Sequence, residues 1–455
     1  MIESFSGIRG IYGKELTNDI ALRYAYAFRK LCRPAKAVIG SDTRASGEKL
    51  RTALIDGLGC DIIDTGVLPA AAVQNAVREY KADGGIIITA SHNEPEYNGF
   101  KFLDKDGAVL RPKDMENLIN FSRKIGALSS EELLSQLGES KPVKRIEKKG
   151  KDALKRYRKF IESFFSRKEK SLLKSLKADF IVDPNGGAGI TAKDILEGLG
   201  IKARYINMKK GEFRREIEPG KSLKFPAAKK KAQFVAGFDC DADRLEIMLN
   251  DSKLASGNHI LALITEDVLA GIKNPEKETV IVNDATSYVV RETAGKYSAG
   301  WKEVEVGEIN VVDAMMDFNS PVGGEGSNGG VILPPSRCRD GILTLICLLK
   351  IMAKKQQSLK ELINSLPKYH YIKEKTALKK DFAEIREKVK QYYLDSGFLI
   401  EETGDETGGL KAIKDNSWVW FRQSKTEKNV LRIIADSKKE KTAASLLSQG
   451  KKLVS

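Results

Sequence analysis

Long apolar runs, paired cysteines and a secretory signal are all missing from this sequence of 455 residues. No apolar run approaches the ~20 residues that a membrane-spanning helix needs, so we expect no membrane-embedded segment. Five cysteines are scattered without the paired spacing of a zinc site, which favours a reducing compartment and mostly buried thiols. The first residues, MIESFSGIRG, lack a basic-then-apolar plan, so we expect a cytoplasmic protein.

Positive charge is in excess, with a formal net charge of +15. Lysines gather in residues 141–159, 168–177 and 229–231, and a nucleic-acid-binding protein is one interpretation of them. Interleaved aromatic residues, zinc spacing and a recognised nucleic-acid module are missing beside these runs. We therefore favour a solvated basic face and expect no nucleic-acid partner. A basic chain also attracts small phosphorylated molecules.

Strand and helix patterns alternate along most of the chain. Its length predicts about three domains, give or take one. Three successive strand–helix units have a similar plan, which suggests a structural repeat although no repeated sequence is found. The last part is shorter and more mixed. We predict an α/β protein of four domains, three similar α/β domains with mixed or parallel sheets and a smaller α+β domain: 1–145, 146–250, 251–368 and 369–455.

The stretch from Gly84 to Lys101, GGIIITASHNEPEYNGFK, organises the first domain. Its β-branched run, residues 86–88, predicts a buried strand. Small polar residues follow, and Asn98-Gly99 predicts a turn. An earlier strand near 38–41 is followed by a helix from Ser46 and by another helix at about 69–80. The pattern is βαβαβ, which predicts a parallel sheet covered on both faces. The polar segment then lies at the C-terminal end of a strand, where open α/β sheets bind ligands.

Ser91 lies within this polar segment, with His92 beside it and Lys101 downstream. A strand that delivers one serine to the tip of a tight loop presents a nucleophile, and Lys101 would supply a cation. An ordinary strand-to-helix turn with a capping serine is the alternative.

Three aspartates follow a second predicted strand, residues 234–238. Asp239, Asp241 and Asp243 alternate in a curved loop, where they can converge on one hard divalent cation. Without a cation, three close negative charges repel one another. The segment lacks the trailing glycine and glutamate of an EF-hand. An acidic surface loop is the alternative, but an apolar strand precedes the segment directly.

Two later loops carry groups that suit polar ligands. In residues 323–330, glycines let the backbone approach a ligand closely, and Glu325, Ser327 and Asn328 can bind hydroxyl groups. A flexible linker is the alternative there. In residues 422–429, a guanidinium and several hydroxyl groups suit a phosphate dianion.

These segments resemble the phosphohexomutases, the superfamily of phosphomannomutase, phosphoglucomutase and phosphoglucosamine mutase. TASHNEPEYNGFK resembles the family's active-site loop, whose serine carries the phosphoryl group. DCDADR resembles its D-G-D-A-D-R magnesium loop, with Cys240 in place of glycine. SGIRG, with Arg9, resembles its N-terminal phosphate segment, and GSDTRASG resembles G-x-D-T-R-x-S-G. We take Asp42 and Arg44 of the latter as structural neighbours of the serine segment, and Ser46 as a helix N-cap.

The other two loops also resemble family segments. GGEGSNGG resembles the archaeal sugar-recognition loop G-G-E-G-N-G-G, with Ser327 as an apparent insertion. RQSKTEKN resembles the phosphate clamp R-P-S-G-T-E-P but loses both prolines, and Lys425 replaces its glycine. The resemblance covers the whole chain, with one recognisable loop in each of the four domains.

The resemblance implies four domains around a central cleft and reversible phosphoryl transfer between the 1- and 6-positions of a hexose phosphate. It implies Mg²⁺ and a hexose 1,6-bisphosphate that serves as intermediate and activator. The implied catalytic residues are Ser91, Lys101, His92 and Arg9, and the implied metal ligands are Ser91, Asp239, Asp241 and Asp243. The implied substrate-binding residues are Arg244, Glu325, Ser327, Asn328, Arg422, Ser424, Lys425 and Thr426.

Because the sugar-recognition loop has an archaeal form, we expect phosphoglucosamine mutase activity first, then phosphoglucomutase or phosphomannomutase activity. The expected partner is a small sugar phosphate, and the protein is expected to be a monomer or homodimer. A metal-dependent phosphatase, a catalytically impaired sugar-phosphate-binding homologue and a nucleic-acid-binding protein are the alternatives. The retained Ser91 and the three aspartates argue against the impaired homologue.

Overall fold

Two compact units make up the computed structural model: Met1–Ala255 with Pro335–Ser358, and Ser256–Pro334 with Leu359–Ser455. The structure describes residues 1–138, 145–218, 220–223, 232–327, 329–378, 381–424 and 429–454. Four sheets form in these residues. Three of them include both parallel and antiparallel strand pairs, and the C-terminal one is antiparallel throughout, so the predicted α/β class is confirmed. No helix in the described residues is long and apolar enough to cross a membrane.

The first sheet has seven strands in the order β1-β2-β6-β5-β3-β4-β7. Its strands are β1 (Ile2–Ser4), β2 (Gly7–Ile11), β3 (Lys36–Ser41), β4 (Asp61–Val67), β5 (Gly84–Ile88), β6 (Tyr97–Leu103) and β7 (Ile146–Lys148). Strand β3 runs parallel to β4 and β5, whereas β5 and β6 are antiparallel. The sheet is therefore mixed, and the segment with Ser91 connects two strands instead of a strand and a helix.

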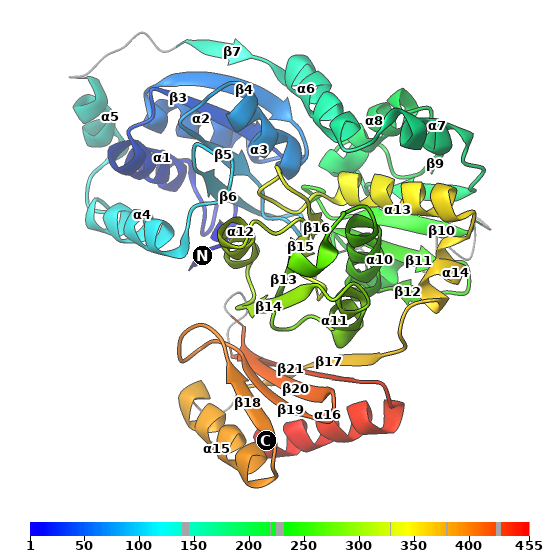
Figure 1. The fold of residues 1–455 in the computed structure, drawn as a ribbon. Helices are drawn as coiled ribbons and strands as arrows, with labels where there is room; N and C mark the ends of the chain where they lie inside the picture. Colours follow the sequence, from blue (N-terminus) through cyan, green and yellow to red (C-terminus); the bar gives the residue numbers. More distant parts are fainter. Residues whose placement is uncertain are drawn as a thin grey trace. The chain divides into compact units, whose positions relative to one another are not determined.

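Helices cover both faces of this sheet, as predicted (Figure 1). They are α1 (Asn18–Cys32), α2 (Gly47–Leu58), α3 (Ala70–Glu79), α4 (Pro112–Lys124), α5 (Ser130–Gly138) and α6 (Gly150–Ser163). Helix α7 (Arg167–Ser175) packs instead against α13 (Gly341–Lys355). Side chains of α1, α2 and α4 pack with Ile86 and Ile88 of β5 in one core. Helix α3 packs against β3 and β5, and α6 packs against α3 and β4. Strand β5 is thus buried on both faces, which fixes the end from which Ser91 projects.

The second sheet, in the same unit, has the order β12-β11-β10-β8-β9. Its strands are β8 (Phe180–Asp183), β9 (Arg204–Tyr205), β10 (Phe234–Phe238), β11 (Leu245–Leu249) and β12 (Leu254–Ala255), with helices α8 (Ala192–Gly198), η1 (Ala188–Thr191), η2 (Gly220–Leu223) and α13 (Gly341–Lys355). Strands β10 and β11 form an antiparallel hairpin. Residues 239–244 are the connection of that hairpin, so the three aspartates lie at its tip.

The second unit contains the other two sheets, in the orders β14-β13-β15-β16 and β17-β21-β20-β19-β18. The third sheet comprises β13 (Thr279–Asn283), β14 (Gly300–Val304), β15 (Gly323–Gly324) and β16 (Val331–Ile332), with α10 (Gly257–Ala270), α11 (Tyr288–Gly295), α12 (Glu308–Asp317), α14 (Leu359–Asn364) and η3 (Pro275–Lys277). The fourth comprises β17 (His370–Ala377), β18 (Leu399–Glu402), β19 (Leu410–Lys414), β20 (Ser417–Gln423) and β21 (Val430–Ser437). Helices α15 (Phe382–Asp395) and α16 (Glu440–Val454) cover one face of the fourth sheet (Figure 1).

The predicted turn at Asn98-Gly99 is wrong, and the predicted N-cap at Ser46 is right in its position alone. Asn98 and Gly99 lie inside β6, not in a turn. A Cβ on Gly99 would approach the Ile8 carbonyl oxygen to 2.1 Å, so this glycine allows close contact with β2. Ser46 does occupy the N-cap position of α2, but its side chain makes no capping hydrogen bond and accepts one from Asn98 instead, at 2.8 Å.

Candidate functional site

Ser91 lies on the loop between β5 and β6, residues 89–96, hereafter the serine loop. Its side chain is almost fully buried, and its backbone is left-handed with φ of 49°. This conformation costs an L-residue about 1–2 kcal/mol, so surrounding contacts must hold it. The Ser91 amide donates to Thr89 Oγ1 at 2.8 Å, and the Ser91 hydroxyl donates to Asp239 Oδ2 at 2.8 Å. The serine therefore faces the aspartates.

Arg44 binds the backbone of the serine loop. Its buried guanidinium donates to the carbonyl oxygens of Ser91 at 3.0 Å, Asn93 at 2.6 Å and Tyr97 at 3.0 Å. Asp42 pairs with Arg44 at 3.1 Å and also accepts from Thr89 Oγ1 at 2.7 Å. Both residues are therefore neighbours of the serine loop, and five planar donors explain why arginine suits the central position.

Residues 239–244, hereafter the aspartate loop, place three buried carboxylates together. Asp239, Asp241 and Asp243 each offer an oxygen, and these oxygens all lie within 4.8 Å of one another. Ala242 takes a left-handed φ of 55°, which curls the loop. Cys240, where the resemblance leads one to expect glycine, is buried with its sulfur 3.9 Å from Thr43 Oγ1. The cysteine therefore fits without displacing the carboxylates.

Positively charged side chains contact the carboxylates of the aspartate loop. Lys101 Nζ, from β6, lies 2.8 Å from Asp241 Oδ2 and 2.9 Å from Asp243 Oδ2. Arg339 Nη2 lies 3.0 Å from Asp243 Oδ2. Burial by itself raises the pKa of Asp243, but Arg339, Lys101 and Arg244 outweigh it and hold that pKa well below its usual range. Burial, with Asp241 and Asp243, raises the pKa of Asp239 well above its usual range.

Two carboxylate oxygens remain for a metal ion. Within the described residues, Asp241 Oδ1 and Asp243 Oδ1 are buried and make no hydrogen bond. Buried carboxylate oxygens without a donor are costly, and hard cations such as Mg²⁺ take such oxygens as ligands. The donor set and its geometry therefore fit a divalent cation held by Asp239, Asp241 and Asp243.

Arg9 and His92 flank the serine loop. Arg9 Nη1 donates to Asn93 Oδ1 at 3.0 Å, and burial lowers the pKa of Arg9 to about 10. Arg244, burial and Arg9 together lower the pKa of His92 well below its usual value. His92 is therefore a neutral imidazole near pH 7, and its Nδ1 lies 4.0 Å from Glu218 Oε2.

The first unit thus brings together eight predicted residues: Arg9, Ser91, His92, Lys101, Asp239, Asp241, Asp243 and Arg244. Two further residues at the site were not predicted from the sequence. Arg339 donates to Asp243, and Glu218 accepts from Arg244 Nη1 at 2.7 Å. Arg339 lies far along the chain from Asp243, and its only local signal is that it precedes a helix. Arg244 N also donates to Asp239 Oδ1 at 3.2 Å.

In the second unit, Glu325 lies buried in the predicted sugar-recognition loop. Its Oε1 accepts from Asn283 Nδ2 and from the Gly307 amide, both at 3.0 Å. Asn283 Nδ2 also donates to Ser327 Oγ at 3.2 Å. Asn328 lies outside the described residues. The loop is therefore held by side-chain contacts around Glu325, unlike a flexible linker.

The predicted phosphate clamp begins at the end of β20. Arg422 is buried, and its Nη2 donates to Glu305 Oε1 at 3.0 Å. Ser424 is also buried, and its amide closes the hairpin on Val430 O at 2.8 Å. Lys425 and Thr426 lie outside the described residues. Glu305 binds Arg422, and the Gly307 amide binds Glu325. Residues 305–307 therefore contact both the predicted phosphate clamp and the predicted sugar-recognition loop.

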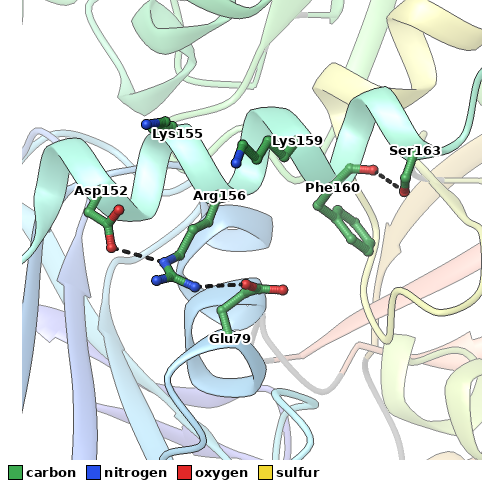
Figure 2. Close-up of a pocket in the computed structure, with 7 residues that line it drawn as sticks. All are labelled: Glu79, Asp152, Lys155, Arg156, Lys159, Phe160 and Ser163. Carbon is green, nitrogen blue, oxygen red and sulfur yellow. Dashed lines mark hydrogen bonds and ion pairs between the residues drawn. The ribbon is translucent and has the colours of Figure 1, made fainter.

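A surface pocket of about 470 Å³ lies apart from these residues, between α3 and α6 (Figure 2). Figure 2 shows Arg156 between Asp152 and Glu79. It pairs with Asp152 at 2.9 Å and with Glu79 at 3.2 Å. Lys155 and Lys159 are also among its lining residues. None of the predicted site residues lines this pocket, and we assign it no ligand.

Comparisons with known proteins identify relatives of this chain. Residues 3–128 match the phosphoglucomutase/phosphomannomutase alpha/beta/alpha domain I, and residues 256–369 match domain III of the same family. A phosphoglucomutase/phosphomannomutase of Thermococcus kodakarensis is 35% identical, over 98% of this chain and 97% of the relative. A phosphoglucosamine/phosphogalactosamine mutase of Sulfurisphaera tokodaii is 29% identical, over 98% of each chain.

A solved structure shares the fold. The phosphoglucomutase/phosphomannomutase family protein from Burkholderia thailandensis aligns with a TM-score of 0.78 and 21% identity, covering 100% of this chain and 97% of that chain. At this identity the likeness concerns the fold alone. The relative of 35% identity, matched along nearly its whole length, carries the assignment: this chain belongs to the phosphoglucomutase/phosphomannomutase family and is a phosphohexomutase.

Proposed function

We propose that the protein interconverts hexose 1-phosphate and hexose 6-phosphate through a phosphorylated Ser91. The observation that carries this proposal is the 2.8 Å contact between Ser91 Oγ and Asp239 Oδ2, at a loop that buries two further carboxylates. A phosphoryl group moves from Ser91 to a sugar hydroxyl, giving a hexose 1,6-bisphosphate. The bisphosphate then reverses its orientation in the site and returns its other phosphoryl group to Ser91.

Asp239, Asp241 and Asp243 are proposed to hold Mg²⁺ together with a phosphoserine oxygen. The bound cation would neutralise charge on the phosphoryl group during transfer. The arrangement of the chain supports this role, because Lys101 and Arg339 contact Oδ2 of the aspartates and leave Oδ1 of Asp241 and Asp243 for a ligand. Lys101 and Arg339 also limit the repulsion among the carboxylates.

Lys101 is our proposed general base or proton shuttle for the reacting sugar hydroxyl. Its Nζ lies within hydrogen-bond distance of Asp241 and Asp243, which places it beside the proposed metal ligands. His92 of the serine loop, held neutral by Arg244 and burial, is the alternative proton acceptor. Arg9, anchored on Asn93, would bind the phosphoryl group beside Ser91.

The substrate-binding roles are proposed from the chemistry of the side chains. Arg244 from the aspartate loop, with Glu325, Ser327 and Asn328, would bind sugar hydroxyl groups. Arg422, Ser424, Lys425 and Thr426 would bind the phosphate that is not reacting. That phosphate is attached to C1 in one half-reaction and to C6 in the other, so charge and hydrogen-bond donors matter more than a fixed shape.

Arg422→Ala is expected to raise KM and lower kcat/KM by roughly ten- to a hundredfold, because a charged hydrogen bond of about 1.5–3 kcal/mol is lost. Steady-state kinetics checks this, with Arg291→Ala as a matched control on the surface of the same unit. Lys425→Gly restores the family residue and should have a much milder effect. Added hexose 1,6-bisphosphate should recover part of the rate of Arg422→Ala. Unchanged kinetics would mean that Arg422 binds no phosphate.

Glucosamine phosphate is our first proposed substrate, with glucose or mannose phosphate as the alternative. A buried carboxylate, Glu325, suits an ammonium group as well as hydroxyls, and the Sulfurisphaera relative is named for amino sugars. The Thermococcus relative of higher identity, named for glucose and mannose phosphates, favours the alternative.

A side-by-side assay decides between these substrates. Glucosamine, glucose and mannose 1-phosphates are compared by kcat/KM at saturating Mg²⁺ and bisphosphate, and we expect the highest value for glucosamine 1-phosphate. A tenfold preference for glucose or mannose phosphate would overturn this choice and leave the mutase activity intact. Phosphate release without isomerisation would identify a phosphatase.

We also propose the domain boundaries, the location and the assembly of the protein. The domain boundaries are placed after residues 145, 250 and 368, and β7 adds residues 146–148 to the first sheet. The five free thiols are compatible with a cytoplasmic location. A monomer or homodimer is the proposed assembly, and size-exclusion chromatography with light scattering distinguishes the two.

A further inference from the structure

The segment Arg339–Gly341, which precedes α13, contacts the aspartate loop on both sides of Asp340. Arg339 Nη2 donates to Asp243 Oδ2 at 3.0 Å, and the Gly341 amide donates to Ala242 O at 3.2 Å. A Cβ on Gly341 would lie only 2.9 Å from Ala242 O, so glycine permits this approach. The position of Asp340 therefore determines how this segment meets the carboxylates.

Asp340 is held in turn by Tyr157 of α6. The Tyr157 hydroxyl lies 2.7 Å from Asp340 Oδ1 and 2.8 Å from Oδ2, and the Leu343 amide donates to Oδ1 at 2.9 Å. Tyr157 is 0% exposed and Asp340 is 1% exposed. Because water does not reach this carboxylate, the tyrosine hydroxyl is a donor that it cannot replace from solvent.

Helix α6 is itself fixed to the rest of the first unit by other residues. Tyr80 donates to Asp152 of α6 at 2.8 Å, and Arg156 pairs with Glu79, the last residue of α3 (Figure 2). At the opposite end of α3, the Ala70 amide donates to Asp241 O at 2.9 Å. The position of α6, and with it that of Tyr157, is therefore fixed by contacts that do not involve Asp340.

We propose that Tyr157 is a positioning residue for the metal centre, acting through Asp340 on Arg339 and Gly341. This inference rests on the proposed role of the three aspartates as Mg²⁺ ligands. By fixing Arg339 on Oδ2 of Asp243, the contact keeps Asp243 Oδ1 available as a ligand atom. Tyr157 touches neither the substrate nor the reacting atoms, so its removal affects metal binding before it affects sugar binding.

Tyr157→Phe tests this in the full-length protein. We expect the Mg²⁺ concentration for half-maximal activity to rise about tenfold, as for other residues that orient metal ligands, and the sugar-phosphate KM to change by less than about twofold. Mn²⁺ binding to the enzyme without substrate, followed by electron paramagnetic resonance, should weaken by a similar factor. High Mg²⁺ should restore the rate.

Tyr80→Phe is the matched control, because it removes another tyrosine–carboxylate hydrogen bond to α6. Tyr80→Phe should leave Mn²⁺ affinity unchanged. If Tyr80→Phe weakened Mn²⁺ binding as much as Tyr157→Phe does, the cause would be loosening of α6, and the proposal would be overturned. Asp243→Asn is the reference for the metal site itself. If Asp243→Asn weakens Mn²⁺ binding and Tyr157→Phe does not, the role of Tyr157 is wrong. Unchanged Mn²⁺ affinity in Asp243→Asn would refute the metal site and this inference with it.

Should Tyr157→Phe fail to fold, Asp340→Asn replaces it. Asparagine still caps a helix, so α13 can form, but the carboxylate shared by Tyr157 and the Leu343 amide is gone. A several-fold loss of Mn²⁺ affinity in this variant is expected, and wild-type affinity would overturn the proposal.

Discussion

Ser91→Ala is expected to abolish mutase activity, lowering kcat by ~10³-fold or more, because the phosphoryl group passes through this one oxygen. The fold should remain, since alanine fits the same backbone space and only the hydrogen bond to Asp239 is lost. Mutase activity and thermal unfolding of the purified variant check both statements.

Ser122→Ala is a suitable control for Ser91→Ala. Ser122 is as deeply buried and lies in the same unit, on α4, outside the site. Its alanine variant should keep wild-type activity. Near wild-type turnover by Ser91→Ala, with contaminating mutase excluded, would refute the phosphoserine mechanism.

Asp241→Asn is expected to have the second largest effect, because it removes one negative charge from the three-carboxylate site. The Mg²⁺ requirement should rise at least about tenfold, and added Mg²⁺ should restore part of the activity. Without metal, thermal stability should change little, because relief of repulsion among the aspartates offsets the lost ion pair with Lys101.

The stabilisation that Mg²⁺ adds to the wild-type protein should shrink in Asp241→Asn, which thermal unfolding with and without Mg²⁺ measures. Asp194→Asn, an exposed aspartate of the same unit, is the control and should behave as wild type. A wild-type enzyme whose activity ignores a chelator would show that the metal assignment is mistaken.

The sequence predicted those parts of the site whose residues are close together in the chain. The serine loop and the aspartate loop each combine an apolar strand with a short polar connection, so both the strand and the chemistry are visible locally. Arg44 and Asp42 were also placed correctly beside the serine loop, on the strength of the resemblance.

Contacts between distant segments were not predictable in the same way. Arg339 binds Asp243, and Tyr157 binds Asp340, across long stretches of sequence that carry no periodic or motif signal for the pairing. Such contacts depend on how α6 and α13 pack, which patterns of hydrophobicity do not specify.

The errors in local structure have a common physical cause. Asn-Gly is typical of turns, but Gly99 is selected by the close approach of β2, a strand from the other end of the domain. The alternation of strands and helices predicted a parallel sheet, yet β6 returns beside β5 without a helix between them. Tertiary pairing therefore overrode two reasonable local signals.

The central claim is that Ser91 carries the phosphoryl group during turnover, and transfer of a labelled group tests it most directly. The enzyme is incubated with hexose 1,6-bisphosphate labelled with ³²P, and the labelled site is mapped by mass spectrometry of peptides. We expect the label on Ser91. When unlabelled hexose phosphate is added, the labelled phosphoryl group should leave Ser91 and appear in hexose 1,6-bisphosphate. Label on another residue, or label on Ser91 that no hexose phosphate removes, would contradict the mechanism.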